Sequence, residues 1–348
     1  MNPYILALLF FTLALGTGIT ATSSHWLLAW MGLEINTLAI IPLMAQHHHP
    51  RAIEATTKYF LTQATAAATI LFAALTNAWL TGQWSIQLMT HPLPTTMIVL
   101  ALSLKLGLAP LHTWLPEVLQ GLDLFTGFIL STWQKLAPFM LLVQMPLANQ
   151  EVLILIGLAS TLIGGWGGLN QIQLRKILAY SSIAHLGWML IVLQFNPTLT
   201  LLALSTYLIM TSSAFLMLKI NSTTTINALS MSWTKTPLLM ALAPLLLLSL
   251  GGLPPMTGFL PKWLILHELT KQHLSMTATL VALTALLSLY FYLRLSYAMT
   301  LTISPNNITA SAPWRLPTAQ SSLPLALFTL TAILMLPLAP AINALVNF

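Results

Sequence analysis

Apolar stretches of about twenty residues follow one another along almost the whole chain, and a stretch of that length can cross a lipid bilayer as a helix. Of the 348 residues, 57% are apolar and 5% are charged. In water-soluble domains about a quarter of all residues are charged, and these residues cover the surface with solvated groups. The sequence therefore predicts an all-α integral membrane protein with lipid as its main solvent.

Eleven membrane spans are expected. They cover residues 3–21, 24–45, 57–80, 95–119, 124–145, 149–170, 175–194, 198–220, 237–270, 275–300 and 323–346. Lysine and arginine are retained on the cytoplasmic or matrix side of a membrane. In this chain they gather on the amino-terminal side, at Arg51, Lys58, Arg175, Lys176, Lys219, Lys235, Arg294 and Arg315, whereas the opposite side holds only Lys271. The amino terminus is therefore predicted to face the matrix or the cytoplasm.

Two of these spans are interrupted by glycine and proline in the same pattern. Residues 107–117 read GLAPLHTWLPE and residues 252–262 read GLPPMTGFLPK, with five of eleven positions identical. Five spans separate the two segments, so the second is predicted to be inverted in the membrane, as in transporter repeats. We expect one membrane domain, residues 1–348. It comprises two inverted five-helix repeats (1–146 and 147–302), each with a broken helix, then a C-terminal loop and helix (303–348).

Four ionisable residues lie near the middle of apolar spans, namely Glu34, Lys105, Lys135 and Lys262. A charge at the centre of a bilayer costs about 2.5–3.5 kcal/mol on insertion scales. Three lysines outnumber one carboxylate, so at least two must be hydrated or neutral part of the time. We interpret them as groups that load and release protons. A structural interpretation stays open, in which Glu34 pairs with one lysine and the others extend to the interface.

Two histidines are candidate proton relays, because imidazole titrates near neutral pH. His112 lies in the first interruption and His185 lies in the middle of the seventh span. A histidine inside a span can equally be a hydrogen-bonded packing residue. The lysines also differ in position, since Lys105 precedes its interruption and Lys262 follows its own. Helix dipoles would then favour a cation at Lys105 and disfavour one at Lys262.

Several classes of site are excluded or not expected. The chain has no cysteine, which excludes disulfides, Fe–S clusters and thiolate metal sites within it. No run of basic residues could follow a phosphate backbone, so nucleic acid binding is not expected. His47, His48 and His49 resemble a metal-binding tract. Three adjacent side chains cannot share one helical face, so we interpret them as a surface loop and expect no metal site.

Several segments, in a fixed order, resemble those of a known family. They are residues 1–3, 24–36, 110–117, 131–135 and 252–262. Over essentially its whole length the chain is similar to NADH–ubiquinone oxidoreductase chain 2, the mitochondrially encoded, antiporter-like membrane subunit of respiratory complex I. The resemblance implies a core membrane-arm subunit that translocates protons across the mitochondrial inner membrane, coupled to electron transfer from NADH to ubiquinone.

The resemblance also implies roles for individual residues. Glu34 and Lys105 would form the ion pair of one half-channel, Lys135 would be the central lysine, and Lys262 would serve the other half-channel. FMN, Fe–S clusters and ubiquinone would bind to other subunits, leaving no cofactor and no redox step in this chain. The expected partners are other membrane-arm subunits, including neighbouring antiporter-like subunits, and the lipid bilayer, with cardiolipin as a candidate lipid.

Three alternatives remain at this point. A free-standing cation/proton antiporter would share the repeats and the lysines, but it would need oxygen-rich cation sites, and one mid-span carboxylate is present. A b-type haem protein would use His112 and His185 as ligands and would show a Soret band. A purely structural scaffold would tolerate replacement of its buried lysines.

Overall fold

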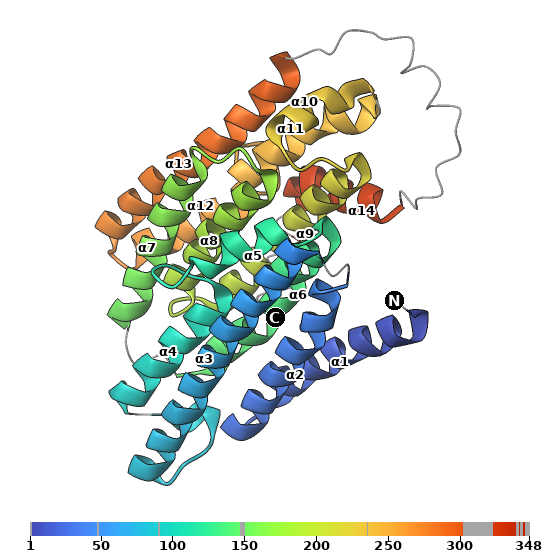
Figure 1. Cartoon of the computed structure of the whole chain (residues 1–348). Helices are drawn as coiled ribbons and strands as arrows, with labels where there is room; N and C mark the ends of the chain where they lie inside the picture. Colours follow the sequence, from blue (N-terminus) through green and yellow to red (C-terminus); the bar gives the residue numbers. More distant parts are fainter. Residues whose placement is uncertain are drawn as a thin grey trace. The chain divides into compact units, whose positions relative to one another are not determined.

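The computed structural model describes residues 2–46, 49–89, 91–146, 150–234, 236–301 and 323–338, together with positions 341 and 344 (Figure 1). Within these residues the regular secondary structure is helical, apart from two isolated bridges that join loops. The α-helices are α1 (Pro3–Thr22), α2 (Trp26–Met44), α3 (Pro50–Thr81), α4 (Pro92–Leu106), α5 (Trp114–Gly121), α6 (Leu124–Gln144), α7 (Gln150–Gly168), α8 (Leu174–Val192), α9 (Pro197–Asn221), α10 (Ile226–Ser230), α11 (Pro237–Gly251), α12 (Phe259–Lys271), α13 (Ser275–Leu301) and α14 (Leu323–Leu334). The predicted all-α fold class is confirmed.

The described helices follow the order of the eleven predicted spans. The pairs α4/α5 and α11/α12 each fill one predicted span, and the five-residue α10 lies in a loop. Six helices are long and apolar enough to cross a membrane by themselves, namely α1, α2, α3, α7, α9 and α13. The features predicted at His47, His48, Lys235 and Arg315 lie outside the described residues.

The starts of several helices follow from local sequence. Five of them begin with a proline at the first position, at Pro3, Pro50, Pro92, Pro197 and Pro237. Proline suits this position because its missing N–H needs no partner there and its fixed φ is already helical. At α3 the ring of His49 also accepts a hydrogen bond from the backbone N–H of Arg51, at 3.2 Å. This cap explains why α3 begins at Pro50, earlier than the residue 57 expected from hydropathy.

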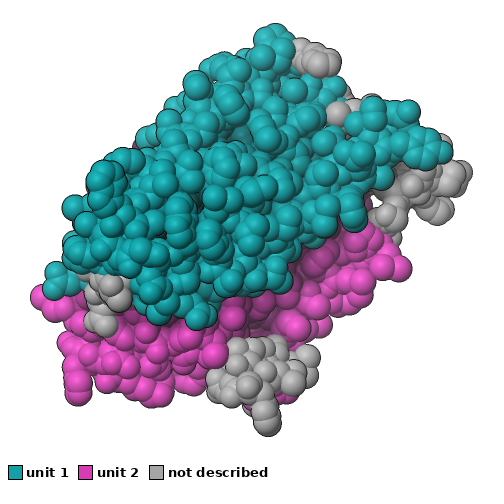
Figure 2. Space-filling view, turned by 90° about the horizontal axis from the view of Figure 1, so that it is seen from below, with its two compact units in different colours: residues 1–159 teal, residues 160–348 magenta. Residues whose placement is uncertain are grey.

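The chain divides into two compact units, residues 1–159 and 160–348, with the boundary inside α7 (Figure 2). In the first unit α1 packs on α2, and α3 packs on α4 and α5 (Figure 1). In the second unit α9 contacts α8, α11, α12 and α14, and α13 contacts α11 and α12. Each unit therefore contains one of the two predicted broken helices.

Both breaks begin with the same backbone motif. α4 stops at Gly107, which has a φ of 78°, and the N–H of the next residue donates to the carbonyl of Ser103 at 2.9 Å. α11 stops at Gly252, which has a φ of 79°, and the N–H of the next residue donates to the carbonyl of Leu248 at 3.3 Å. This is a Schellman termination, and it uses the positive φ that glycine adopts readily. The two matching sequence segments thus form matching helix ends.

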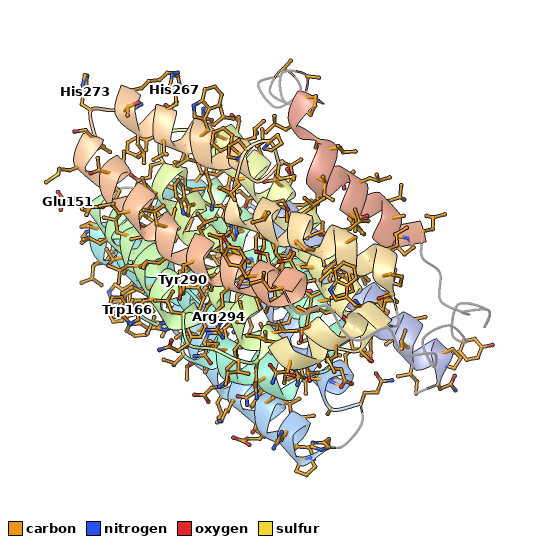
Figure 3. All side chains as sticks on the ribbon, turned by 90° about the horizontal axis from the view of Figure 1, so that it is seen from above. Glu151, Trp166, His267, His273, Tyr290 and Arg294 are labelled. Atoms are coloured by element: carbon orange, nitrogen blue, oxygen red, sulfur yellow. The ribbon has the colours of Figure 1, made fainter. Side chains whose placement is uncertain are left out.

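An arginine holds the carboxyl end of α7 in the second unit. Arg294, labelled on α13 in Figure 3, donates from Nη1 to the carbonyl of Leu169 at 2.5 Å and from Nη2 to the carbonyl of Gln171 at 2.7 Å. Carbonyls after a helix have no partner within it, and a cation is favoured at that end. Arg294 therefore has a structural role as a cap.

Candidate functional site

A cavity of about 20 Å³ lies in the first unit, between α2, α3, α4, α5 and α6. Lys105 on α4 and Lys135 on α6 both line it, so the structure brings together two of the predicted site residues. The other polar side chains on its wall are Asn36, Thr37, Tyr59, Gln63 and Gln134. A cavity of this size, with polar groups on its wall, can hold about one water molecule.

Lys105 lies in the last turn of α4 and is 6% exposed. Among the described residues its Nζ has no hydrogen-bond partner, and the same is true of Nε2 of Gln63 on the cavity wall. Buried donors are almost always satisfied by protein or by ordered water. These two nitrogen atoms therefore fit a hydrated site and do not fit a dry apolar core.

Lys135 lies in the middle of α6 and is 2% exposed. One turn later Pro138, which also lines the cavity, has no N–H to donate to the carbonyl of Gln134. The side chain of Gln134 donates from Nε2 to the backbone carbonyl of Asn36 on α2, at 3.2 Å. Lys135 thus lies in a stretch of helix that lacks one backbone hydrogen bond of the usual pattern and has a polar link to a neighbouring helix.

Glu34 lies on α2 and is half-buried. Its Oε2 accepts a hydrogen bond from Oγ1 of Thr37, at 2.9 Å, and Thr37 lines the cavity. The direct ion pair expected between Glu34 and Lys105 is not formed in this structure. Any link between the two groups therefore runs through space or through the cavity.

His112 lies in the first break but does not line the cavity. It is half-buried, and its Nδ1 lies 3.2 Å from the carbonyl oxygen of Pro110, two residues earlier. The structure therefore does not place His112 on the wall of the cavity that the two lysines share.

The second unit holds Lys262 at its own break. Lys262 is in the first turn of α12, and its Nζ donates to the carbonyl of Gly251, the last residue of α11, at 2.8 Å. The same Nζ lies 5.9 Å from the ring centroid of Trp188 on α8. The methylene chain of Lys262 packs beside Gly252, where a Cβ would come within 2.7 Å of Cδ. Lys262 is thus held across the break that it follows.

His185 lies on α8, one turn before Trp188. Residues three apart share a helical face, so His185 is on the face whose indole contacts Lys262. Its ring lies 5.7 Å from the ring of Tyr207 on α9, which is fully buried. The structure therefore places His185 on the face of α8 that also carries Trp188, the residue facing Lys262.

Two residues of these sites were not found from the sequence. Trp114 lines the cavity and donates from Nε1 to the carbonyl of Leu104 at 3.0 Å, and Trp188 faces Lys262. The sequence could have indicated Trp114, because the matching position of the second segment is also aromatic, at Phe259. Each of the two residues begins the helix after its break. Nothing in the sequence indicated Trp188, since a tryptophan near the end of a span is common in membrane helices.

The fold and these sites together define a class of protein. The structure matches a chain of respiratory complex I from Thermus thermophilus with a TM-score of 0.80 and 32% sequence identity, over 96% of this chain and 80% of that one. It matches a chain of the Mrp complex from Dietzia sp. DQ12-45-1b with a TM-score of 0.81 at 15% identity, over 97% of this chain and 75% of that one, which is a likeness of fold alone. With its two broken helices and buried lysines, the protein is an antiporter-like polytopic membrane protein.

Within this class, the chain belongs to the family of NADH–ubiquinone oxidoreductase chain 2. Residues 23–288 match the family described as NADH:quinone oxidoreductase/Mrp antiporter, TM, and residues 289–343 match the NADH dehydrogenase subunit 2 C-terminus. Proteins named NADH-ubiquinone oxidoreductase chain 2 from Tetraodon nigroviridis and Danio rerio are 73% and 64% identical to it, over 100% and 98% of this chain and 100% and 99% of theirs. The predicted family is confirmed, and a free-standing antiporter is not better supported.

Proposed function

We propose that this chain translocates protons across the mitochondrial inner membrane as an antiporter-like core subunit of the membrane arm of respiratory complex I, coupled to electron transfer from NADH to ubiquinone. The observation that carries the proposal is the cavity shared by Lys105 and Lys135. An amine can bind and release a proton, and desolvation disfavours its charged form, so a buried amine releases its proton more readily than one in water. A water molecule between two such amines would let a proton pass from one to the other.

We assign Glu34, Lys105 and Lys135 as the proton-carrying groups of the first unit. Two features support this assignment. The Nζ of Lys105 has no hydrogen-bond partner among the described residues, and the Thr37 hydroxyl joins Glu34 to the cavity wall. A carboxylate near an amine favours the charged form of the amine, and this effect weakens as the distance between the two groups grows. Movement of Glu34 relative to Lys105 would then gate the first half-channel.

We assign Lys262 as the proton-carrying group of the second unit, with His185 as its relay. His185 and the Trp188 indole that contacts Lys262 lie on one face of α8. His112 is proposed as a relay on the half-exposed side of the first break, away from the cavity. Imidazole can accept a proton on one nitrogen and release one from the other, which suits both positions.

The remaining parts of the proposal concern the surroundings of the chain. The described residues contain no group of three side chains able to hold a metal ion, and the whole sequence has no cysteine. We propose that FMN, Fe–S clusters and ubiquinone bind to other subunits, and that neighbouring antiporter-like subunits and lipid, cardiolipin included, cover the membrane-facing helices. The amino terminus is proposed to face the matrix, because the basic loops lie on its side.

The proposal is tested by replacing Lys135 with methionine in the assembled complex. Complex reconstituted in liposomes is supplied with NADH and a quinone, and protons moved per electron pair are measured. A positioned acid–base group contributes about 10²–10⁴-fold to a proton-transfer rate, so we expect pumping through this subunit to be lost. Lys271→Met is the matched control, because Lys271 is 58% exposed at the end of α12.

Two outcomes of this experiment decide the matter. A lower proton ratio in Lys135→Met, with an unchanged ratio in Lys271→Met, supports the assignment. An unchanged ratio in both variants contradicts it. If Lys135→Met reduces the amount of assembled complex, Lys105→Met provides the same test from the other lysine of the cavity.

A further inference from the structure

α5 is a short helix that follows the first break directly and begins beside the cavity. A helix of eight residues is not stable by itself, so contacts with neighbouring elements determine where it lies. Three of its residues, Trp114, Glu117 and Gly121, are spaced by three and four positions and share one face. Each of them contacts the amino-terminal part of α3.

These three contacts form the seam between α5 and α3, and the central one is an ion pair. Nζ of Lys58 lies 2.8 Å from Oε2 of Glu117 on α5 and 2.7 Å from Oε1 of Glu54 on α3. Glu54 and Lys58 belong to the same helix, one turn apart, so only the pair with Glu117 joins the two helices. The side chains of Lys58 and Glu117 are 43% and 53% exposed, and exposed ion pairs stabilise only modestly. The pair can therefore bias the position of α5 without deciding whether the protein folds.

Two closer contacts flank the ion pair. At the far end of α5, a Cβ on Gly121 would come within 2.6 Å of the backbone oxygen of Arg51, so the two helix backbones approach closely there. At the near end, the ring of Trp114 packs edge-on against Tyr59, with centroids 5.8 Å apart. The same indole donates its N–H to the carbonyl of Leu104 on α4. The seam thus extends from the exposed end of α5 to the end of α4.

Leu104 immediately precedes Lys105, and Trp114 and Lys105 line the same cavity. We propose that Lys58 is a positioning residue: its ion pair with Glu117 holds α5 against α3 so that Trp114 keeps the end of α4 and the cavity wall beside Lys105 in place. An exposed pair of charges thereby acts on a buried proton-carrying group without contacting it. The effect on pumping rests on the proposed function, whereas the effect on α5 does not.

The structural part is tested by amide hydrogen exchange in the purified complex. Glu117→Gln removes the contact between the helices, and Glu54→Gln is the matched control, because it removes a partner of Lys58 on the same helix only. We expect exchange of the α5 amides to become about two- to fivefold faster in Glu117→Gln and to stay unchanged in Glu54→Gln. The double variant Lys58→Gln with Glu117→Gln should exchange no faster than Glu117→Gln alone. Equal exchange in Glu117→Gln and the native complex overturns the proposal.

The functional part uses the same variants in liposomes, at matched amounts of assembled complex. Glu117→Gln and Lys58→Gln are expected to lower the protons moved per electron pair, and Lys58→Arg is expected to restore the ratio, since it keeps the charge. Faster α5 exchange with an unchanged ratio in both variants overturns the positioning role. If Lys135→Met leaves the ratio unchanged, the proposed function fails, while the exchange result for α5 is still decided on its own.

Discussion

Replacing Gly252 with alanine would displace Lys262 while leaving its amine in the protein. A Cβ on Gly252 would lie 2.7 Å from Cδ and 2.9 Å from Nζ of Lys262, closer than real Cβ atoms approach other heavy atoms. The lysine side chain is flexible, so it would move and the backbone would stay. Its hydrogen bond to the carbonyl of Gly251, now 2.8 Å, would be lost.

The magnitude has two separable parts. Alanine at a φ of 79° costs about 1–2 kcal/mol because its Cβ crowds the backbone in the left-handed region. Loss of a hydrogen bond from a charged group costs about 1.5–3 kcal/mol. Gly82→Ala is the matched control, because Gly82 has a φ of 72° and a Cβ there would meet nothing within 4 Å. The difference in unfolding free energy between the two variants should therefore be about 1.5–3 kcal/mol, the hydrogen-bond part alone.

Both variants are compared in the assembled complex by thermal inactivation and by protons moved per electron pair. We expect Gly82→Ala to lower stability slightly and to pump normally, and Gly252→Ala to lower stability further and to pump fewer protons. Equal pumping by the two variants would refute the argument that the position of the Lys262 amine matters. Equal stability would refute the argument that its hydrogen bond is made in the folded protein.

Three further substitutions test single contacts. Arg294→Gln removes the charged cap after α7 and should speed amide exchange at the end of that helix, by an amount equivalent to about 1.5–3 kcal/mol. Gln134→Leu removes the link to the Asn36 carbonyl and should lower the free energy of unfolding by about 1 kcal/mol in thermal melting of the complex. Trp188→Leu removes the ring facing Lys262 and should slow proton pumping about two- to thirtyfold, as measured in liposomes.

The order of the described helices could be predicted because lipid imposes one rule on the whole chain. Backbone groups that face lipid must be paired, and an apolar stretch of sufficient length pairs its own groups by forming a helix. The two breaks were equally predictable, since Gly107 and Gly252 stand where a continuous span would be too long or contains proline. The exact ends of the helices were harder to predict from hydropathy. For example, α3 begins at Pro50, with His49 as its cap, before its apolar stretch starts.

The contacts of the site depended on tertiary packing and were predicted less well. Hydropathy identifies a lysine as buried but does not show which helix it faces. The cavity that joins Lys105 to Lys135 is formed by five helices, and no pattern along one helix indicates it. The expected pairing of Glu34 with Lys105 came from the resemblance to the family, because charge alone does not say which lysine Glu34 would pair with. In the structure the carboxylate accepts its hydrogen bond from Thr37, on its own helix.

Lys105 and Lys262 have more similar surroundings at their helix breaks than their positions before and after the breaks suggest. Lys105 is in the last turn of α4, at the carboxyl end of a half-helix, where a cation is favoured. Lys262 is in the first turn of α12, where the dipole of its own helix disfavours a cation, as the sequence indicated. Its side chain, however, reaches back across the break to the carbonyl of Gly251, the carboxyl end of α11. In each unit the lysine is thus associated with the carboxyl end of the half-helix before the break, through its position in α4 for Lys105 and through its hydrogen bond for Lys262. A change in the geometry of the break would therefore alter the distance between the lysine and that helix end, and with it the effect of the helix dipole on the amine.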